Sequence, residues 1–137
     1  MPFEELEHTA DIKMRITADD FPSLLCESGF SLAKTLYGDY PSEQSVKTVN
    51  FEADGDDDVE LVVNFLSELL FQMEVEYLVP QSFSLNVQGT HVSGTVSGVE
   101  FDRKKHAGGI GVKGISYSGI SLTKTNTELE LILIFDI

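Results

Sequence analysis

The chain has 137 residues, and its 23 Asp and Glu against nine Lys and Arg give a formal net charge of −14 at pH 7. Nucleic-acid affinity rests largely on neutralising phosphates, so this charge argues against a stand-alone RNA or DNA binder. It suits a cation or a partner with a basic surface, although an acidic surface that serves only solubility is an equally good interpretation. The length predicts a single domain over residues 1–137.

The cysteine content and the hydropathy of the chain narrow the class of protein further. The one cysteine, Cys26, excludes an intramolecular disulfide framework. We find no secretory signal at the N-terminus and no apolar run long enough to span a bilayer. We therefore expect a cytoplasmic protein that does not contact a membrane.

The first predicted strand follows a short polar segment. Ile12, Met14 and Ile16 alternate with polar residues, and this period of two predicts a half-buried strand. The preceding residues 8–11 hold an imidazole, a hydroxyl and a carboxylate at the mouth of that strand, where functional groups are often placed. From the spacing alone, we favour the simpler interpretation that these side chains satisfy nearby backbone groups.

A helix is predicted next, beginning after Asp20. Asp20 is a typical N-cap residue, Pro22 is tolerated in the first turn, and Gly38 supplies a stop. Gly29 falls in the apolar stripe of this helix, where the missing side chain permits a close approach to a sheet. A second strand is predicted over residues 44–52.

The acidic run 54–58 invites a calcium-loop interpretation, because its alternate aspartates copy the odd-position ligands of an EF-hand. An EF-hand loop also needs Gly at its sixth position and Glu at its twelfth, and these positions hold Val59 and Phe65. We interpret the run as a helix N-terminus, where acidic side chains meet unpaired amides. Asp57 and Glu60 are spaced as in a capping box.

The second predicted helix has a wide apolar stripe of the kind that packs on a protein core. Its members are Val62, Phe65, Leu66, Leu69, Leu70 and Met73. Glu68 falls between the stripe positions, and the pattern alone favours a solvated surface residue there.

From residue 79 onward the pattern is that of β-structure. Alternating apolar residues predict strands near 79–87 and 92–99, with a turn at Gly89. A predicted loop at 101–106 holds three of the nine basic residues. It could contact phosphate or an acidic partner, although a solvated charge run is the favoured interpretation.

The end of the chain predicts three more strands, over residues 110–117, 120–125 and 129–135. Ser118-Gly119 predicts a tight hairpin turn between the first two, and Asn126-Thr127 a second turn. The last strand is apolar on both faces, so we expect it to be central and covered by helices. The order β-α-β-α followed by about five strands predicts an α+β fold, with two helices packed on a largely antiparallel or mixed sheet.

Five segments in this order resemble motifs of the archease family. They are the HTAD segment His8–Asp11, the helix 61–70, the F-D-x-x-x-H segment 101–106, the V-K-A-x-T-Y-like segment 112–117, and the terminal Asp136-Ile137. The chain departs from the family pattern at several of the matched or adjacent positions. Phe65 stands for Trp, Ser67 for Asn, Gly114 for Ala, and Ser118 for a frequent His.

The resemblance implies an accessory protein of the RtcB-type RNA ligase, which joins exons in tRNA splicing with GTP and a divalent metal. Such a protein stimulates guanylylation of the ligase and its multiple turnover, is not itself an enzyme, and meets RNA only through the ligase. The resemblance also implies a divalent-cation site at Asp11, Asp136 and Ile137, with Ca²⁺ as the expected ion and Mg²⁺ or Mn²⁺ as the alternatives.

Four further residues on the matched motifs are candidates for a functional surface: His8, Glu68, Lys113 and His106. Lys113 could pair with a phosphate, with an acidic partner group, or with Glu68. His8 suits a supporting role better than ligation, because hard cations prefer oxygen.

Two other function classes stay open. A small metal-dependent hydrolase could use the same carboxylates with His8 or His106 as acid or base. The chain lacks a P-loop, a nucleophile elbow and a zinc-type His pair, which disfavours this class. A general chaperone is the other alternative, because an acidic surface could bind basic clients.

Overall fold

The computed structural model describes residue 2 and residues 11–137. Its elements are, in chain order, β1 (Asp11–Ala18), α1 (Phe21–Tyr37), β2 (Lys47–Asp54), α2 (Asp58–Val75), β3 (Leu78–Gln88), β4 (His91–Glu100), α3 (Arg103–His106), β5 (Gly114–Ile115), β6 (Ser121–Lys124) and β7 (Leu129–Asp136). Within the described residues, no helix is both long enough and apolar enough to cross a bilayer.

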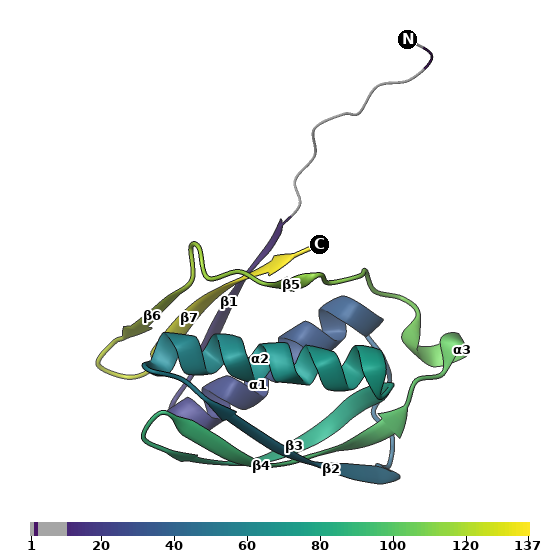
Figure 1. Ribbon diagram of the computed structural model, residues 1–137, viewed down its shortest axis with the longest axis horizontal. Coiled ribbons are helices and arrows are strands. Elements are labelled where there is room, and N and C mark those ends of the chain that lie inside the picture. The colour runs from purple at the N-terminus through teal and green to yellow at the C-terminus, as the bar shows by residue number, and fades with distance from the viewer. Residues whose placement is uncertain (1, 3–10) are drawn as a thin grey trace.

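The strands form two antiparallel sheets with the two long helices between them (Figure 1). One sheet has β7 between β1 on one edge and β5 and β6 on the other, and the second sheet has the order β2-β4-β3. Helix α1 contacts β1, β7 and β3, whereas α2 contacts both sheets through β2 and β5. The predicted α+β class is confirmed, and the helices pack between two sheets instead of on one.

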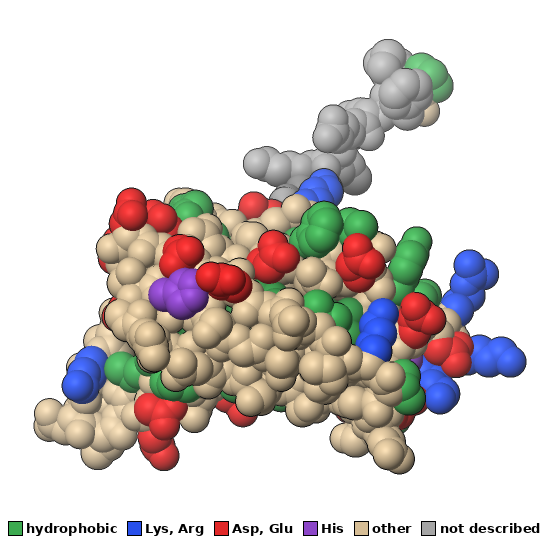
Figure 2. Space-filling view, turned by 60° about the horizontal axis from the view of Figure 1, so that its bottom comes forward, with side chains coloured by type: hydrophobic (Ala, Val, Ile, Leu, Met, Phe, Trp, Pro, Cys, Tyr) green, Lys and Arg blue, Asp and Glu red, His purple; other side chains and the backbone are tan. Residues whose placement is uncertain are grey.

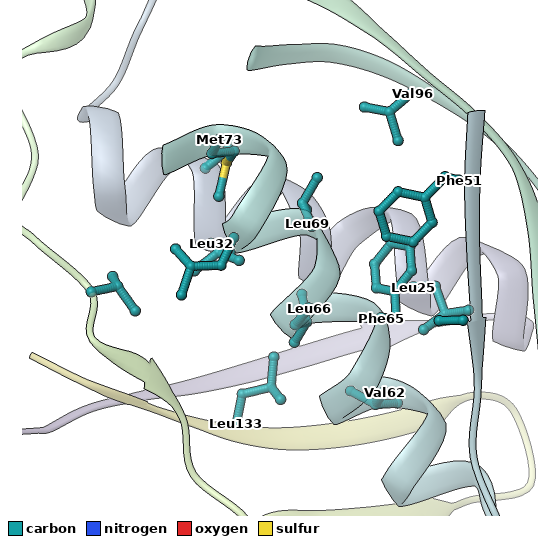
Figure 3. Close-up of a cluster of buried hydrophobic side chains, with 14 of the residues drawn as sticks. Leu25, Leu32, Phe51, Val62, Phe65, Leu66, Leu69, Met73, Val96 and Leu133 are labelled. Carbon is teal, nitrogen blue, oxygen red and sulfur yellow. The ribbon is translucent and has the colours of Figure 1, made fainter. Parts of the chain in front are cut away.

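The predicted stripe of α2 is buried along its whole length, and it forms the centre of the core. Phe65 packs edge-to-face on Phe51 of β2, with ring centroids 5.1 Å apart. Figure 3 shows side chains from both layers around α2: Leu25 and Leu32 from α1, Phe51 and Val96 from one sheet, and Leu133 from the other. Each large side chain buried in this way contributes about 1.5–3 kcal/mol.

Both predicted helix starts are confirmed. The Asp20 carboxylate accepts a hydrogen bond from the Ser23 amide at 2.8 Å, and the Asp57 carboxylate accepts one from the Glu60 amide at 2.8 Å. The Glu60 carboxylate reaches back to the Asp56 amide at 3.2 Å, one residue before the position that a capping box uses. These contacts satisfy amides that have no partner within the helix.

Gly29 brings α1 close to the second sheet, as its place in the apolar stripe predicts. A Cβ atom at this position would lie 2.7 Å from Cζ of Phe83 on β3. Any side chain on Gly29 would therefore displace the Phe83 ring.

The predicted hairpin at Ser118-Gly119 is wrong. Strands β5 and β6 both pair antiparallel with β7, so they run in the same direction along one edge. The expected strand 110–117 is reduced to Gly114–Ile115, and the residues between β5 and β6 leave the edge and return to it. The turn at Asn126-Thr127 does join β6 to β7, as predicted. The predicted loop 101–106 contains the short helix α3.

Strand β7 is central, as predicted, but it is fully buried on one face only. Leu131, Leu133 and Phe135 face the helices and are inaccessible to solvent. Ile132 and Ile134 lie on the outer face and are half-buried, because both long helices pack on the other side of this sheet. Their register partners on β1 are Arg15 and Lys13, whose long aliphatic stems suit a half-covered apolar surface.

Candidate carboxylate pair at the ends of the first and last strands

The two aspartates predicted to hold a cation stand directly opposite each other. Asp11 is the first residue of β1, Asp136 is the last residue of β7, and the antiparallel register makes them direct partners. The register is unbroken from this pair to Ala18 and Leu129. The pairing of β1 with β7 therefore brings together two residues that are 125 positions apart in the chain.

Both aspartates lie on the outer face of their sheet. Opposite residues of an antiparallel pair project to the same face, and their Cβ atoms are typically about 4.5–5.5 Å apart. The neighbouring pair Ile12 and Phe135 projects toward the helices, so Asp11 and Asp136 project away from them. Two like charges in this arrangement repel each other, and a bound cation relieves the repulsion.

Strand β5 leaves the space beside Asp136 open. Gly114 is the partner of Asp136 on this side, and a Cβ atom at Gly114 would meet no heavy atom of the described residues within 4 Å. Next to it, the Lys113 amide donates a hydrogen bond to the backbone carbonyl of Asp136 at 2.7 Å. The Lys113 backbone is thereby fixed beside the carboxylate pair, while its side chain is exposed.

The donor set fits a hard cation with an incomplete shell. Asp11 and Asp136 supply carboxylate oxygens, and Ile137 follows with its own backbone oxygens while its side chain packs on the core. The described residues contain no group of three or more His, Cys, Asp or Glu side chains arranged around one ion. Because Ca²⁺ takes six to eight oxygens, most ligands at this position would come from water or from a partner.

Glu68 lies on α2 and does not pair with Lys113. Its carboxylate accepts a hydrogen bond from the Gln72 amide group at 3.4 Å, and among the described residues no carboxylate lies within 4 Å of the Lys113 ammonium. Of the three options for Lys113, the pairing with Glu68 is therefore not formed. The ammonium remains accessible to an external anion or partner group.

His106 is not a surface residue, in contrast to the prediction. It is only 1% exposed, and the rings of Tyr37, Tyr40 and Phe101 surround it with centroids 5.8–6.1 Å away. Its Nδ1 accepts the amide proton of Asp102 at 2.9 Å, so the neutral ring carries its proton on Nε2, which has no polar partner among the described residues. Figure 1 places α3 away from the C-terminal end of β7.

His8 lies outside the described residues. Two residues of α2 that the predicted stripe does not include, Phe71 and Val75, are 49% and 52% exposed. Their signal in the sequence was an apolar pair, four residues apart, at positions outside the core stripe.

Residues 3–137 match the Archease protein family (MTH1598/TM1083). The chain belongs to the archease family. The chain is 31% identical over 128 residues to an archease of Methanopyrus kandleri, with 90% of this chain and 91% of that protein covered. It is 31% identical over 147 residues to an archease-like protein of Drosophila melanogaster, with 100% of this chain and 91% of that protein covered.

Two solved structures share the fold. A crystal structure of an archease from Thermotoga maritima, described as a possible chaperone, superposes with a TM-score of 0.71 at 17% identity and covers 98% of this chain and 97% of its own. A solution structure of Methanobacterium thermoautotrophicum protein 1598 gives 0.73 at 20% identity and covers 96% of each chain. Family membership supports an accessory or chaperone-like role for the chain.

Proposed function

We propose that this archease is an accessory protein that activates the GTP-dependent RtcB-type RNA ligase of tRNA splicing. It promotes guanylylation of the ligase and allows more than one round of ligation. The observation that carries this proposal is the Asp11–Asp136 register, because it unites two motifs from opposite ends of the chain in one exposed acidic site.

The carboxylate pair holds a divalent cation, with Asp11 and Asp136 as side-chain ligands and Ile137 as a backbone ligand. The oxygen-only donors favour Ca²⁺, with Mg²⁺ or Mn²⁺ as alternatives, over zinc. The open position beside Gly114 gives a ligand from the ligase or from GTP access to the same ion.

Lys113 supplies a positive charge at the edge of this site. Its backbone is fixed by the bond to Asp136, and its ammonium is accessible, so it suits contact with a phosphate or an acidic group of the partner. Glu68 is a candidate contact on the adjacent helix α2, which packs against β5.

The test is an RNA ligation assay with limiting ligase, with and without this protein, at several concentrations of GTP and divalent metal. The proposal predicts that product exceeds one equivalent per ligase only when the protein is present. Equal product with and without it, under every condition, contradicts the proposal.

A chaperone-like role is the second candidate, and the exposed pair Phe71 and Val75 favours it. Suppression of aggregation for several unrelated client proteins would support this role. The hydrolase alternative offered His8 or His106 as acid or base, and the burial of His106 among aromatic rings disfavours the second of these. Nucleotide turnover with Mn²⁺ that disappears in Asp11→Ala would favour it nevertheless.

A further inference from the structure

A hollow of about 430 Å³ lies where the C-terminal ends of α1 and α2 meet the segment that follows β4. Figure 1 shows α3 at this end of α2. Tyr37, Met73 and His106 line the hollow and are buried. None of the residues proposed for the cation site lines it, so it is a separate feature.

Exposed aromatic and aliphatic groups form the rim of this hollow. Tyr77, Phe101 and Ile110 are 57%, 38% and 46% exposed, although each is large and apolar enough to be buried in a core. Phe71 and Val75, on the last turns of α2, are exposed as well. An exposed apolar surface of this kind marks an interaction site more often than isolated residues do.

Tyr77 is held on the rim by an unfavourable backbone conformation. Its φ of 58° is in the left-handed region, and it is the one non-glycine residue there among those described. A bulky residue in this region is uncommon, and such conformations cluster at binding sites. The strain places an aromatic ring over the hollow instead of in the core.

The carboxylate that lines the hollow favours a cation. Glu74 lies in the last turn of α2 and lines the hollow, Glu76 is the C-cap, and this last turn has no basic residue. A helix C-terminus carries a partial negative charge, which cations normally balance. Lys47 donates to the Glu76 carbonyl at 3.0 Å and lies 3.7 Å from the carboxylate of Glu100, so its charge serves the end of α2 and Glu100. Among the described residues, no basic side chain forms a salt bridge with Glu74.

We propose that this hollow binds an Arg or Lys side chain carried on an apolar segment of a protein partner. The cation meets the carboxylate of Glu74 and the exposed ring of Tyr77, which attracts a cation through its quadrupole. The apolar residues of the segment cover Ile110 and the Phe71–Val75 surface. This inference does not depend on the ligase proposal, because it concerns a different surface and any partner with this chemistry.

The experiment uses a short blocked peptide of alternating Arg and Leu as the probe, with a matched peptide of Glu and Leu. Binding to the full chain is measured by fluorescence anisotropy, and backbone amide NMR shifts locate the bound peptide. Glu74→Gln removes the charge of the hollow. Glu27→Gln makes the same change in an exposed residue of α1 and serves as the control.

We expect shifts at the hollow residues and about a five-fold weaker affinity in Glu74→Gln, the change given by loss of an exposed charge pair of about 1 kcal/mol. Tyr77→Gly, which suits the positive φ and should fold, also weakens binding. Glu27→Gln changes the affinity less than about two-fold.

Three results would overturn the inference. Equal weakening by Glu74→Gln and Glu27→Gln would show non-specific attraction to an acidic protein. Preference for the Glu and Leu peptide would point to an acidic partner that Arg103 and Lys104 recognise. If the chain self-associates and the added peptide then causes no amide shifts at the hollow, a second copy of the chain occupies the hollow.

Discussion

Asp11 and Asp136 form the terminal pair of the β1–β7 ladder, and their side chains share the outer face of the sheet. The pair combines a strand pairing, which the fold needs, with a like-charge contact, which the fold does not need. Like charges opposite each other destabilise a strand pair, and a bound cation would offset that repulsion. The first prediction follows from these two effects.

Asp11→Asn should raise the stability of the metal-free protein by up to about 1 kcal/mol, because it removes repulsion between carboxylates on opposite strands. We expect Ca²⁺ to raise the melting temperature of the unaltered chain and Asp11→Asn to abolish that increase. Thermal unfolding with EDTA and with Ca²⁺ measures both effects. Asp19→Asn changes an exposed aspartate just beyond the opposite end of β1, so it is the matched control and should retain the Ca²⁺ response.

A second prediction concerns the two faces of β7. Leu133→Ala should destabilise the protein by about 2–5 kcal/mol, because Leu133 is fully buried against the helices. Ile132→Ala should cost clearly less, since Ile132 is half-buried on the outer face. Urea unfolding of both variants gives the comparison. Equal losses would mean that the outer face is covered as completely as the inner one.

A third prediction concerns pH. His91 contacts Asp54 through Nδ1 and Glu52 through Nε2, the latter at 3.3 Å, and the hydrogen bond to Asp54 raises the pKa of His91 above its usual value. A raised pKa means that this stabilisation is fully present below the unfolded pKa of about 6.5 and is lost as pH rises through the folded value.

The stability difference between the unaltered chain and His91→Gln should therefore shrink as pH rises above about 6.5. Urea unfolding across this range measures it. Figure 2 shows acidic side chains spread widely over one face of the molecule, so the same series in high salt separates the local contact from the general charge. A difference that stays constant with pH is the outcome that disagrees.

A fourth prediction tests the strain at Tyr77. Tyr77→Gly should leave stability unchanged or raise it by about 1 kcal/mol, because glycine adopts the positive φ freely. Tyr77→Ala keeps the strained backbone and should not stabilise. Melting temperatures of the two variants decide between strain and ordinary packing.

The sequence predicted the elements well where the signal is local. Asp20, Asp57 and Gly38 define helix ends through short-range hydrogen bonds and backbone preference, and the α2 stripe defines its buried face. The division into two sheets was not predictable in the same way, because a strand's alternation does not say which strand it pairs with.

Two predictions in the last third of the chain were wrong because tertiary contacts decide the outcome there, instead of the local sequence pattern. Ser118-Gly119 has the composition of a hairpin turn, and Gly119 does adopt a φ of 82°, but the flanking segments pair with β7 instead of with each other. His106 was expected on the surface because it ends the motif 101–106 that resembles the family's F-D-x-x-x-H loop. In the short helix α3 those residues face solvent while His106 faces the aromatic rings.

The carboxylate pair was anticipated only through the family resemblance. Alternation places Asp11 on the polar face of its strand, but its partner lies at the other end of the chain, and no local pattern links them. The strand register supplies the link.

The most direct test of the central claim is the number of ligations per ligase molecule in the presence of this protein, with GTP and divalent metal, for the unaltered chain, Asp136→Asn and the control Asp19→Asn. We predict several ligations with the unaltered chain and the control, and no more than one with Asp136→Asn. Stimulation by Asp136→Asn equal to that of the unaltered chain would contradict the account.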